Sequence, residues 1–323
     1  MQTQTSRQWM VTHEWMVKPM QQKEWIEKQG ILVWLSEVFS ALGTGLYLVA
    51  IFVDSWYGAL AGYLIVMLLK LPLHLLYLGK PLRFWRTMPP FSSAWRTSWI
   101  ARGVVFTVFF SIFGLLQLIT SYILGSDIVA GQAQEIVFYA DVVLKIFAGI
   151  FVVLTGIYCG FMMSYCKSVP FWNTGILPIV ILMAGIADGL ALLMGIAFFT
   201  EVDHFELMKF IHSLEYASRI VIGANAVLLG TYLLNASYHS STAELSVKEL
   251  LVGRVALIFW LGIVLFGIAL PLAISFISMF TGESTTILLV AGIMGHTAGA
   301  FALKYCILKV GIYKPILPKS IVF

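Results

Sequence analysis

Eight long apolar stretches constrain this chain more than any other feature of its sequence. Each is about as long as the roughly 20 residues that an α-helix needs to cross the hydrocarbon core of a bilayer. Their apolar residues occupy every side of the helix, as contact with both lipid and neighbouring helices requires. The expected spans are 31–53, 57–78, 101–124, 136–163, 176–199, 212–236, 251–279 and 286–308.

The composition agrees with a membrane protein. Charged residues make up 11% of the chain and apolar residues 60%, whereas about 25% of the residues in soluble domains are charged. The sequence therefore predicts an all-α, polytopic membrane protein with eight transmembrane helices, arranged as two four-helix bundles. It divides into a polar interfacial tail at 1–30 that could contact a partner, a membrane domain at 31–308 and a second tail at 309–323.

Basic residues are distributed unevenly among the loops. Lys and Arg are concentrated in both tails and in the loop at 79–100, whereas the loops at 54–56, 125–135 and 280–285 contain neither. Short cytoplasmic loops carry the excess of Lys and Arg in membrane proteins. The sequence thus predicts a protein of the cytoplasmic membrane with both termini in the cytoplasm. The same asymmetry accounts for the basic pI, so no nucleic-acid partner is expected.

Side chains that could hold a redox centre are few. The three cysteines form no C-x-x-C pair, which argues against an iron–sulfur cluster or a structural zinc. His74, His212 and His296 are the histidines expected at or near membrane depth, and they fall at different depths. This disfavours a haem with two histidine ligands. We therefore expect neither haem nor an iron–sulfur cluster in this protein.

The segment after the second span combines helix-ending residues with cations and aromatic rings. Gly79 and Pro81 end the helix, and Arg and Lys then alternate with Trp and Phe as far as Arg102. One interpretation is anchoring by the positive-inside effect and an aromatic belt. The other is an ordered loop that binds a quinone head group or docks an acidic partner. The docking residues would be Lys80, Arg83, Trp85, Arg86 and Arg96.

Three blocks, in the same order, resemble the NrfD/PsrC family of membrane-anchor subunits. The segment 77–85 (YLGKPLRFW) is similar to the family's H-L-G-R-P-x-R-F-W turn after its second helix, with Tyr77 at the histidine position and Lys80 at an arginine position. The segment 160–178 is similar to the family's connection between helices four and five. The stretch 212–215 (HSLE) is similar to its H-x-x-E at the start of helix six.

The resemblance implies a quinone-binding subunit of a multi-subunit oxidoreductase. Such a subunit exchanges electrons between the quinone pool and a ferredoxin-like iron–sulfur subunit, here docked over the 79–100 loop. A catalytic subunit, usually with a molybdenum or tungsten bis-pterin, would be a further partner. Menaquinone or ubiquinone would be the bound substrate, and the catalytic centre would lie on another subunit. The charge pattern places these partners on the cytoplasmic face.

Inserting a charged side chain at membrane depth costs about 2.5–3.5 kcal/mol, so each such residue is expected to have a structural or functional reason to be there. Several lie near the expected cytoplasmic end, where they could surround one quinone pocket. A carboxylate or imidazole there could exchange protons, while a phenol or a cation could contact a carbonyl oxygen. The expected quinone-binding residues are Glu37, His74, Tyr77, Arg83 and Arg102.

Further ionisable residues extend from this pocket towards the outer face. Asp141 with Lys145, and Glu215 with Arg219, have the i, i+4 spacing that lets two side chains of one helix meet. One interpretation of each pair is charge neutralisation for insertion; the other is a route for protons. The candidate proton path comprises Lys70, Asp141, Lys145, Asp188, Glu215, Arg219 and His296.

Three other functions remain open from the sequence. A secondary transporter or proton channel would tend to have repeated helix breaks at mid-membrane, and Pro72, Pro178 and Pro271 show no such symmetry. A haem-b anchor would be recognised by an absorption spectrum. A purely structural anchor would keep its quinone-linked turnover after substitution of Glu37 or His74.

Overall fold

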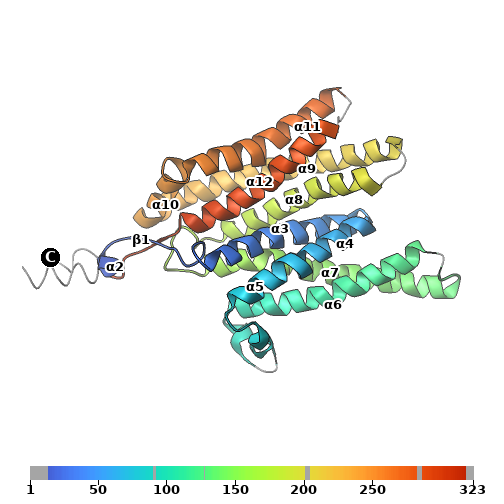
Figure 1. Cartoon of the computed structure of the whole chain (residues 1–323), viewed down its shortest axis with the longest axis horizontal. Helices are drawn as coiled ribbons and strands as arrows, with labels where there is room; N and C mark the ends of the chain where they lie inside the picture. Colours follow the sequence, from blue (N-terminus) through green and yellow to red (C-terminus); the bar gives the residue numbers. More distant parts are fainter. Residues whose placement is uncertain (1–13, 90–91, 127, 201–203, 282–285, 318–323) are drawn as a thin grey trace, which may run out of the picture.

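The computed structural model describes residues 14–89, 92–126, 128–200, 204–281 and 286–317. Within these ranges, eight helical segments are long and apolar enough to cross a membrane. They lie side by side along the length of the molecule (Figure 1). The predicted all-α fold with eight spans is thereby confirmed, and the protein is a multi-pass membrane protein.

The spans form two groups of four (Figure 1). The first group consists of α3 (Gly30–Phe52), the second span α4 (Trp56–Leu64), η1 (Ile65–Lys70) and α5 (Leu71–Tyr77), then α6 (Trp99–Gly125) and α7 (Gln132–Ser164). The second group consists of α8 (Ile176–Thr200), α9 (His204–His239), the seventh span η4 (Ile258–Ala269) and α11 (Leu270–Thr281), then α12 (Thr286–Lys309).

The two groups meet where α3 packs against α8, and these are the most buried of the eight spans. Glycines allow the two backbones to touch. A Cβ atom on Gly45 would lie 1.7 Å from the carbonyl oxygen of Gly185, and one on Gly189 would lie 2.3 Å from the carbonyl carbon of Gly45. Small residues at a crossing let membrane helices gain van der Waals contact along their backbones. The glycines therefore join the two bundles.

Two spans contain π-helical turns followed by a Leu-Pro-Leu sequence. The segment η1 precedes Pro72 in the second span, and η4 precedes Pro271 in the seventh. A proline inside a helix lacks an N–H donor and clashes with the carbonyl four residues earlier. A wider π turn gives that carbonyl more room, and such turns recur at functional sites. The hydropathy pattern did not predict either irregularity.

The backbone turns sharply after α5. Gly79 has a φ of 69°, a left-handed conformation that favours glycine. Two short 3₁₀ helices follow, η2 (Pro81–Thr87) and η3 (Ala94–Arg96). The Ser98 side chain then accepts a hydrogen bond from the backbone N–H of Ala101 and caps the start of α6. The described part of this loop thus has regular local structure.

The sequence prediction of the start of the seventh span at 251 is wrong. Residues before it form a separate helix, α10 (Ser241–Leu251), and the backbone turns at 252–255 before the span begins. Helix α10 buries one face, with Ala243, Val247 and Leu250. In the sequence, α10 directly precedes the seventh span. A hydropathy average over neighbouring residues therefore does not separate the apolar face of α10 from the apolar span. The sixth span also extends beyond the predicted 212–236, because α9 continues past the apolar core at both ends.

Both described tails lie at the same end of the molecule, as an even number of spans requires. Strand β1 (Met20–Gln21) pairs antiparallel with β2 (Ile312–Tyr313), and α2 (Glu14–Val17) precedes this pairing. The Gln22 amide donates to the carbonyl of Leu308. The expected interfacial tail therefore packs, over its described part, on the opposite end of its own chain.

Charged groups fasten the two tails together. The Lys309 ammonium lies 2.8 Å from a Glu27 carboxylate oxygen, and this hydrogen bond lowers the pKa of Glu27 below its usual value. The Tyr313 hydroxyl donates to Glu24 over 3.1 Å. Burial, together with the neighbouring Glu24 carboxylate, raises the pKa of Tyr313 to about 12.

Candidate functional site

A cavity of about 180 Å³ lies between the second, third and fourth spans, in the half of the molecule that carries the tails. We call it the Lys70 cavity. Its polar lining comes from five side chains on three different helices, and its apolar lining includes Phe84 of η2. The polar residues are Lys70, His74, Thr107, Ser111 and Tyr158.

Lys70 is the last residue of the π-helical turn, and its side chain is buried. Its ammonium donates to the Thr107 hydroxyl over 2.8 Å and lies 5.2 Å from the centre of the Tyr158 ring. Among the described residues, Thr107 is the hydrogen-bond acceptor that this group meets. An ammonium has three N–H donors, so donors remain for a ligand in the cavity.

His74 and Tyr158 form the adjoining wall. Their rings are nearly perpendicular, with centres 6.3 Å apart. The buried Nδ1 atom of His74 has no hydrogen-bond partner in the described part of the protein. Gly103 makes room for Tyr158, because a Cβ atom there would lie 2.4 Å from that ring. The wall thus combines an aromatic face with an imidazole whose buried Nδ1 atom has no described hydrogen-bond partner.

Glu37 lies behind the cavity and does not line it. The carboxylate is buried beside Cys159, and the charges nearest to it are Lys304 and Lys70. The Oε1 atom of Glu37 and the Nζ atom of Lys304 both lack a hydrogen-bond partner within the described ranges. Sequence reasoning missed Lys304, although a lysine inside the apolar stretch at 286–308 is itself a signal of a buried charge.

The predicted pocket residues are only partly brought together. His74 lines the cavity and Glu37 lies behind it, but Tyr77, Arg83 and Arg102 are absent from its lining. Instead, Arg102 fastens the loop. Its guanidinium donates to the carbonyls of Trp95 and Arg96 over 2.9 and 2.6 Å and lies 4.5 Å from the Trp99 ring.

Four polar lining residues were not among the residues predicted to bind quinone. Lys70 was assigned to the proton path, and Thr107, Ser111 and Tyr158 were not singled out at all. The four lie on three different helical segments, η1, α6 and α7. These residues come together only through tertiary packing. A hydroxyl or phenol within an apolar stretch does not by itself mark a binding site in the sequence.

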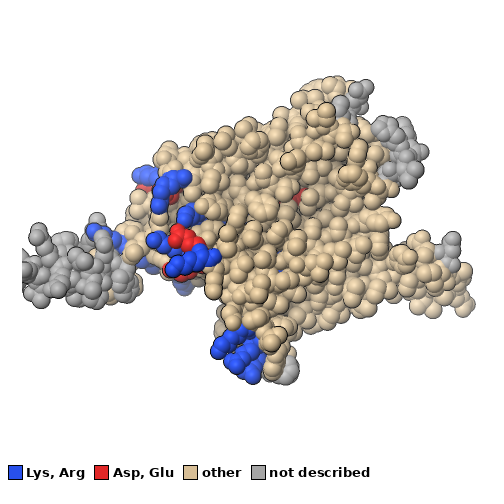
Figure 2. Space-filling model, viewed as in Figure 1, with Lys and Arg blue, Asp and Glu red and all other residues tan. Residues whose placement is uncertain are grey.

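The five predicted docking residues lie together on the loop after α5, which we call the basic loop surface: Lys80, Arg83, Trp85, Arg86 and Arg96. All five side chains are exposed. The Arg86 guanidinium lies 5.4 Å from the Trp85 ring. On the face shown in Figure 2, Lys and Arg gather at the tail end and on the loop beneath it, while the opposite end is largely uncharged.

A second group of buried ionisable residues lies in the second bundle. Nδ1 of His296 is 3.2 Å from a carboxylate oxygen of Asp188. His296 lines two cavities of about 30 Å³ each, one shared with Asp188 and Asn225 and the other with Glu215. Each is large enough for a water molecule. Three buried polar atoms of these residues have no hydrogen-bond partner among the described residues: Asp188 Oδ2, His296 Nε2 and Asn225 Oδ1.

Of the two expected i, i+4 pairs, the structure forms one. Lys145 lies 3.1 Å from Asp141. Arg219, in contrast, donates to the carbonyl and hydroxyl of Ser275 over 2.9 and 3.1 Å, while Glu215 accepts from Ser278 over 2.8 Å. Both serines lie on α11, which packs against α9. These partners on α11 replace the expected contact between Glu215 and Arg219, which the described residues do not form.

Metal ligands are not clustered in the described residues: within them, no group of three or more His, Cys, Asp or Glu side chains could hold a metal ion. The Lys70 cavity is instead lined mainly by apolar residues, with a few polar groups from three helical segments. Binding pockets of this kind are mostly apolar and have a few convergent polar groups.

Comparison with known proteins identifies relatives over most of the sequence. The family model for polysulphide reductase, NrfD, matches residues 32–315. The C subunit of the polysulfide reductase of Wolinella succinogenes is 32% identical over 171 residues, which are 52% of this protein and 53% of that relative. The match therefore spans about half the length of that relative.

Two further relatives are matched over longer stretches. The NrfD homolog of Haemophilus influenzae is 26% identical over 262 residues, covering 76% of this protein and 78% of the relative. Protein NrfD of Escherichia coli K12 is 28% identical over 225 residues, covering 65% and 68%. The protein belongs to the polysulphide reductase NrfD family.

Proposed function

We propose that this protein is the membrane-anchor and quinone-reactive subunit of a multi-subunit oxidoreductase. It would exchange electrons between membrane quinone, either menaquinone or ubiquinone, and a ferredoxin-like iron–sulfur partner. The Lys70 cavity carries this proposal, because it places a buried ammonium, an imidazole and a phenol around one small space. The name of the Wolinella relative, a subunit of polysulfide reductase, supports membership of an oxidoreductase complex.

The cavity is large enough to admit the carbonyl-bearing ring of a quinone head group. An engineered protein cavity of about 150 Å³ binds benzene, and the Lys70 cavity measures about 180 Å³. The Lys70 ammonium can donate a hydrogen bond to one quinone oxygen and stabilise the negative charge that develops there during reduction. The imidazole of His74, which also lines the cavity, can take up or release a proton of the quinone reaction.

The basic loop surface lies next to this cavity. Phe84 lines the cavity, and its neighbours Arg83 and Trp85 belong to the loop surface. An iron–sulfur subunit with an acidic face would dock there by charge complementarity, and a catalytic molybdenum or tungsten bis-pterin subunit would attach to it. The positive-inside rule places this end, and thus the partners, in the cytoplasm.

Substitution of Lys70 tests the proposal. Lys70→Met keeps an unbranched side chain, one atom shorter, and removes the donor, so we expect quinone binding and quinone-linked turnover to be lost. Leu68→Met is the matched control, because Leu68 lies on the same π-helical turn with its side chain 64% exposed. Wild-type quinone affinity and turnover in Lys70→Met would contradict the proposed site.

A second candidate function is proton translocation through the second bundle. The Asp188–His296 pair supports it, since the pair lies between Lys304 on one side and the cavity shared with Glu215 on the other. Asp188→Asn would then abolish transmembrane proton movement in reconstituted vesicles while quinone binding persists. Unchanged proton movement in a variant lacking both Asp188 and Glu215 would eliminate this route.

A further inference from the structure

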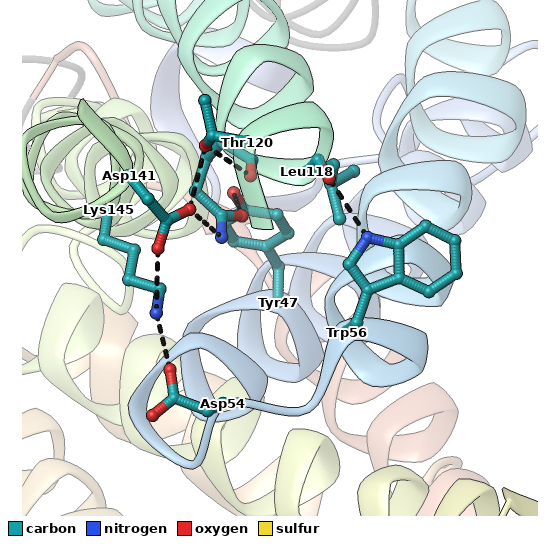
Figure 3. A network of polar contacts seen from close by, with 8 residues as sticks. Tyr47, Asp54, Trp56, Leu118, Thr120, Asp141 and Lys145 are labelled. Atoms are coloured by element: carbon teal, nitrogen blue, oxygen red, sulfur yellow. Dashed lines mark hydrogen bonds and ion pairs between the residues drawn. The ribbon is translucent and has the colours of Figure 1, made fainter. Parts of the chain in front are cut away.

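A separate polar network lies in the first bundle (Figure 3), and it begins at the turn between α3 and α4, at the end opposite the tails (Figure 1). Its first residue is Asp54, whose side chain is 77% exposed. The Lys145 ammonium bridges Asp54, at 2.5 Å, and the buried Asp141, at 3.1 Å. This ion triad connects an exposed carboxylate with one in the interior of the bundle.

The network continues inward from Asp141 along α6. The Thr120 hydroxyl donates to Asp141 over 2.8 Å, and the Gln117 amide does so over 3.5 Å. The Tyr47 hydroxyl in turn donates to the side-chain carbonyl oxygen of Gln117 over 2.8 Å. Tyr47 is completely buried. The hydrogen-bonded groups therefore lead from the exposed end into the buried interior of the first bundle.

Polar residues of α6 also lead from the Lys70 cavity towards Tyr47. Thr107, Ser111, Gly114 and Gln117 follow one another on α6 at spacings of four, three and three, which places them on one face of the helix. The first two line the cavity. The Tyr47 hydroxyl lies 3.4 Å from the Gly114 carbonyl. From Thr107 to Gln117 the helix rises by about 15 Å.

Phe110 separates the two polar segments. Its buried ring meets Tyr47 edge to face at 4.9 Å between centres and lies 5.8 Å from the Tyr63 ring. Tyr63 donates to the carbonyl of Ser111, on the cavity side. The Phe110 ring thus packs against Tyr47 of the outer network and against Tyr63, whose hydroxyl is bonded at the cavity-lining Ser111.

We propose that this column conducts the protons of the quinone reaction between the Lys70 cavity and the aqueous phase opposite the tails, with Phe110 as its gate. The inference rests on the proposed quinone function. Oxidation of one hydroquinone releases two electrons and two protons: the electrons pass to the iron–sulfur partner at the tail end, and the protons leave past Tyr47 and Asp141. Quinone reduction runs both flows in reverse.

The consequence is an electrogenic reaction. Electrons and protons leave the cavity towards opposite ends of the molecule, so each turnover separates charge across the membrane. The hydroxyls of Ser111, Tyr47 and Thr120 supply relay groups, and water molecules complete the contacts when the Phe110 ring moves. Gln117 positions Asp141 and Tyr47, because an amide does not readily gain or lose a proton.

A proton-leak experiment tests the column without any quinone. The full-length protein is placed in liposomes, a potassium diffusion potential is applied, and a dye inside reports pH. We expect Phe110→Ala to raise proton flux well above the wild-type level. The double variant Phe110→Ala with Asp141→Asn should lose that increase. Phe109→Ala is the control, because Phe109 is 39% exposed and stacks on Phe113 and Phe151 away from the column.

The outcomes separate the two proposals. Wild-type proton flux in a folded Phe110→Ala protein, or a leak that Asp141→Asn does not reduce, would overturn the column. Failure of the quinone function would appear differently, as a wild-type protein that neither binds nor turns over quinone while Phe110→Ala still leaks. In the intact complex, Asp141→Asn should also lose the membrane potential generated by quinol oxidation, with quinone affinity unchanged.

Discussion

At the scale of single residues, the buried charges of this protein depend on partners from other helices. Lys70 has one described acceptor, Thr107 on α6, and Glu37 has none for one of its oxygens within the described residues. An unpaired buried polar group costs free energy. The Lys70 cavity, which this ammonium lines, is therefore poised to bind a polar ligand that would supply further contacts.

Removal of the Thr107 hydroxyl should show how the Lys70 ammonium is held. Thr107→Val keeps the side-chain shape but deletes the acceptor, so we expect the free energy of unfolding to fall by about 1–3 kcal/mol. Bound quinone should restore part of this loss, because its oxygen replaces the hydroxyl. Thermal unfolding in detergent, with and without a quinone analogue, measures both effects. Thr107→Ser retains the acceptor and should behave as wild type.

At the scale of helices, hydropathy predicted which segments cross the lipid, but it predicted little of how neighbouring helices pack and how their backbones deviate from regular α-helix. The eight spans follow from apolar length alone. Helix α10 was merged into the seventh span because its buried face is apolar too. The π-helical turns are a matter of hydrogen-bond register, which hydropathy does not detect. Spacing predicted the contact between Asp141 and Lys145, but Arg219 found Ser275 on α11 instead of Glu215.

The same limit applies to the candidate site. His74 and Glu37 were predicted because ionisable residues stand out in apolar stretches. The residues that complete the cavity, such as Thr107 and Tyr158, are ordinary in a membrane helix, and they reach Lys70 only because α6 and α7 pack beside the second span. A sequence can thus show that a buried charge exists, while its partners depend on which helices adjoin.

The π-helical turn before Pro72 should determine where Lys70 points. Pro72→Ala restores an N–H donor and removes the clash with the preceding turn, so we expect η1 to relax towards α-helical geometry and rotate Lys70 relative to Thr107. Quinone affinity should then fall although no lining residue has changed. Pro271→Ala is the matched control, since it alters the equivalent Leu-Pro-Leu of the seventh span, away from the Lys70 cavity. Equal quinone affinity in the two variants would contradict this role of the turn.

At the scale of the whole molecule, the contact between α3 and α8 holds together the bundle with the Lys70 cavity and the bundle with the Asp188–His296 pair. Gly45→Ala would place a methyl group 1.7 Å from the Gly185 carbonyl oxygen, so the helices must separate. We expect a loss of stability of at least about 1–3 kcal/mol, as for other overpacked interiors, measured by unfolding in detergent. Gly230→Ala on α9 should be tolerated, because no atom lies within 4 Å of its added Cβ.

In the proposed reaction, the orientation of the molecule would decide which compartment receives the electrons and which the protons. Both described tails and the basic loop surface lie at one end, and the positive-inside rule predicts that this end is cytoplasmic. Single-cysteine labelling in whole cells checks this, after replacement of Cys166, the native cysteine that is only partly buried. Ser93→Cys in the loop after α5 should resist an impermeant thiol reagent until the membrane is broken. Ile128→Cys, in the loop between α6 and α7 with its side chain 67% exposed, should react in intact cells. The reverse pattern would place the iron–sulfur partner outside the cytoplasm and turn the proposed charge separation around, while the Lys70 cavity and the column would keep their roles.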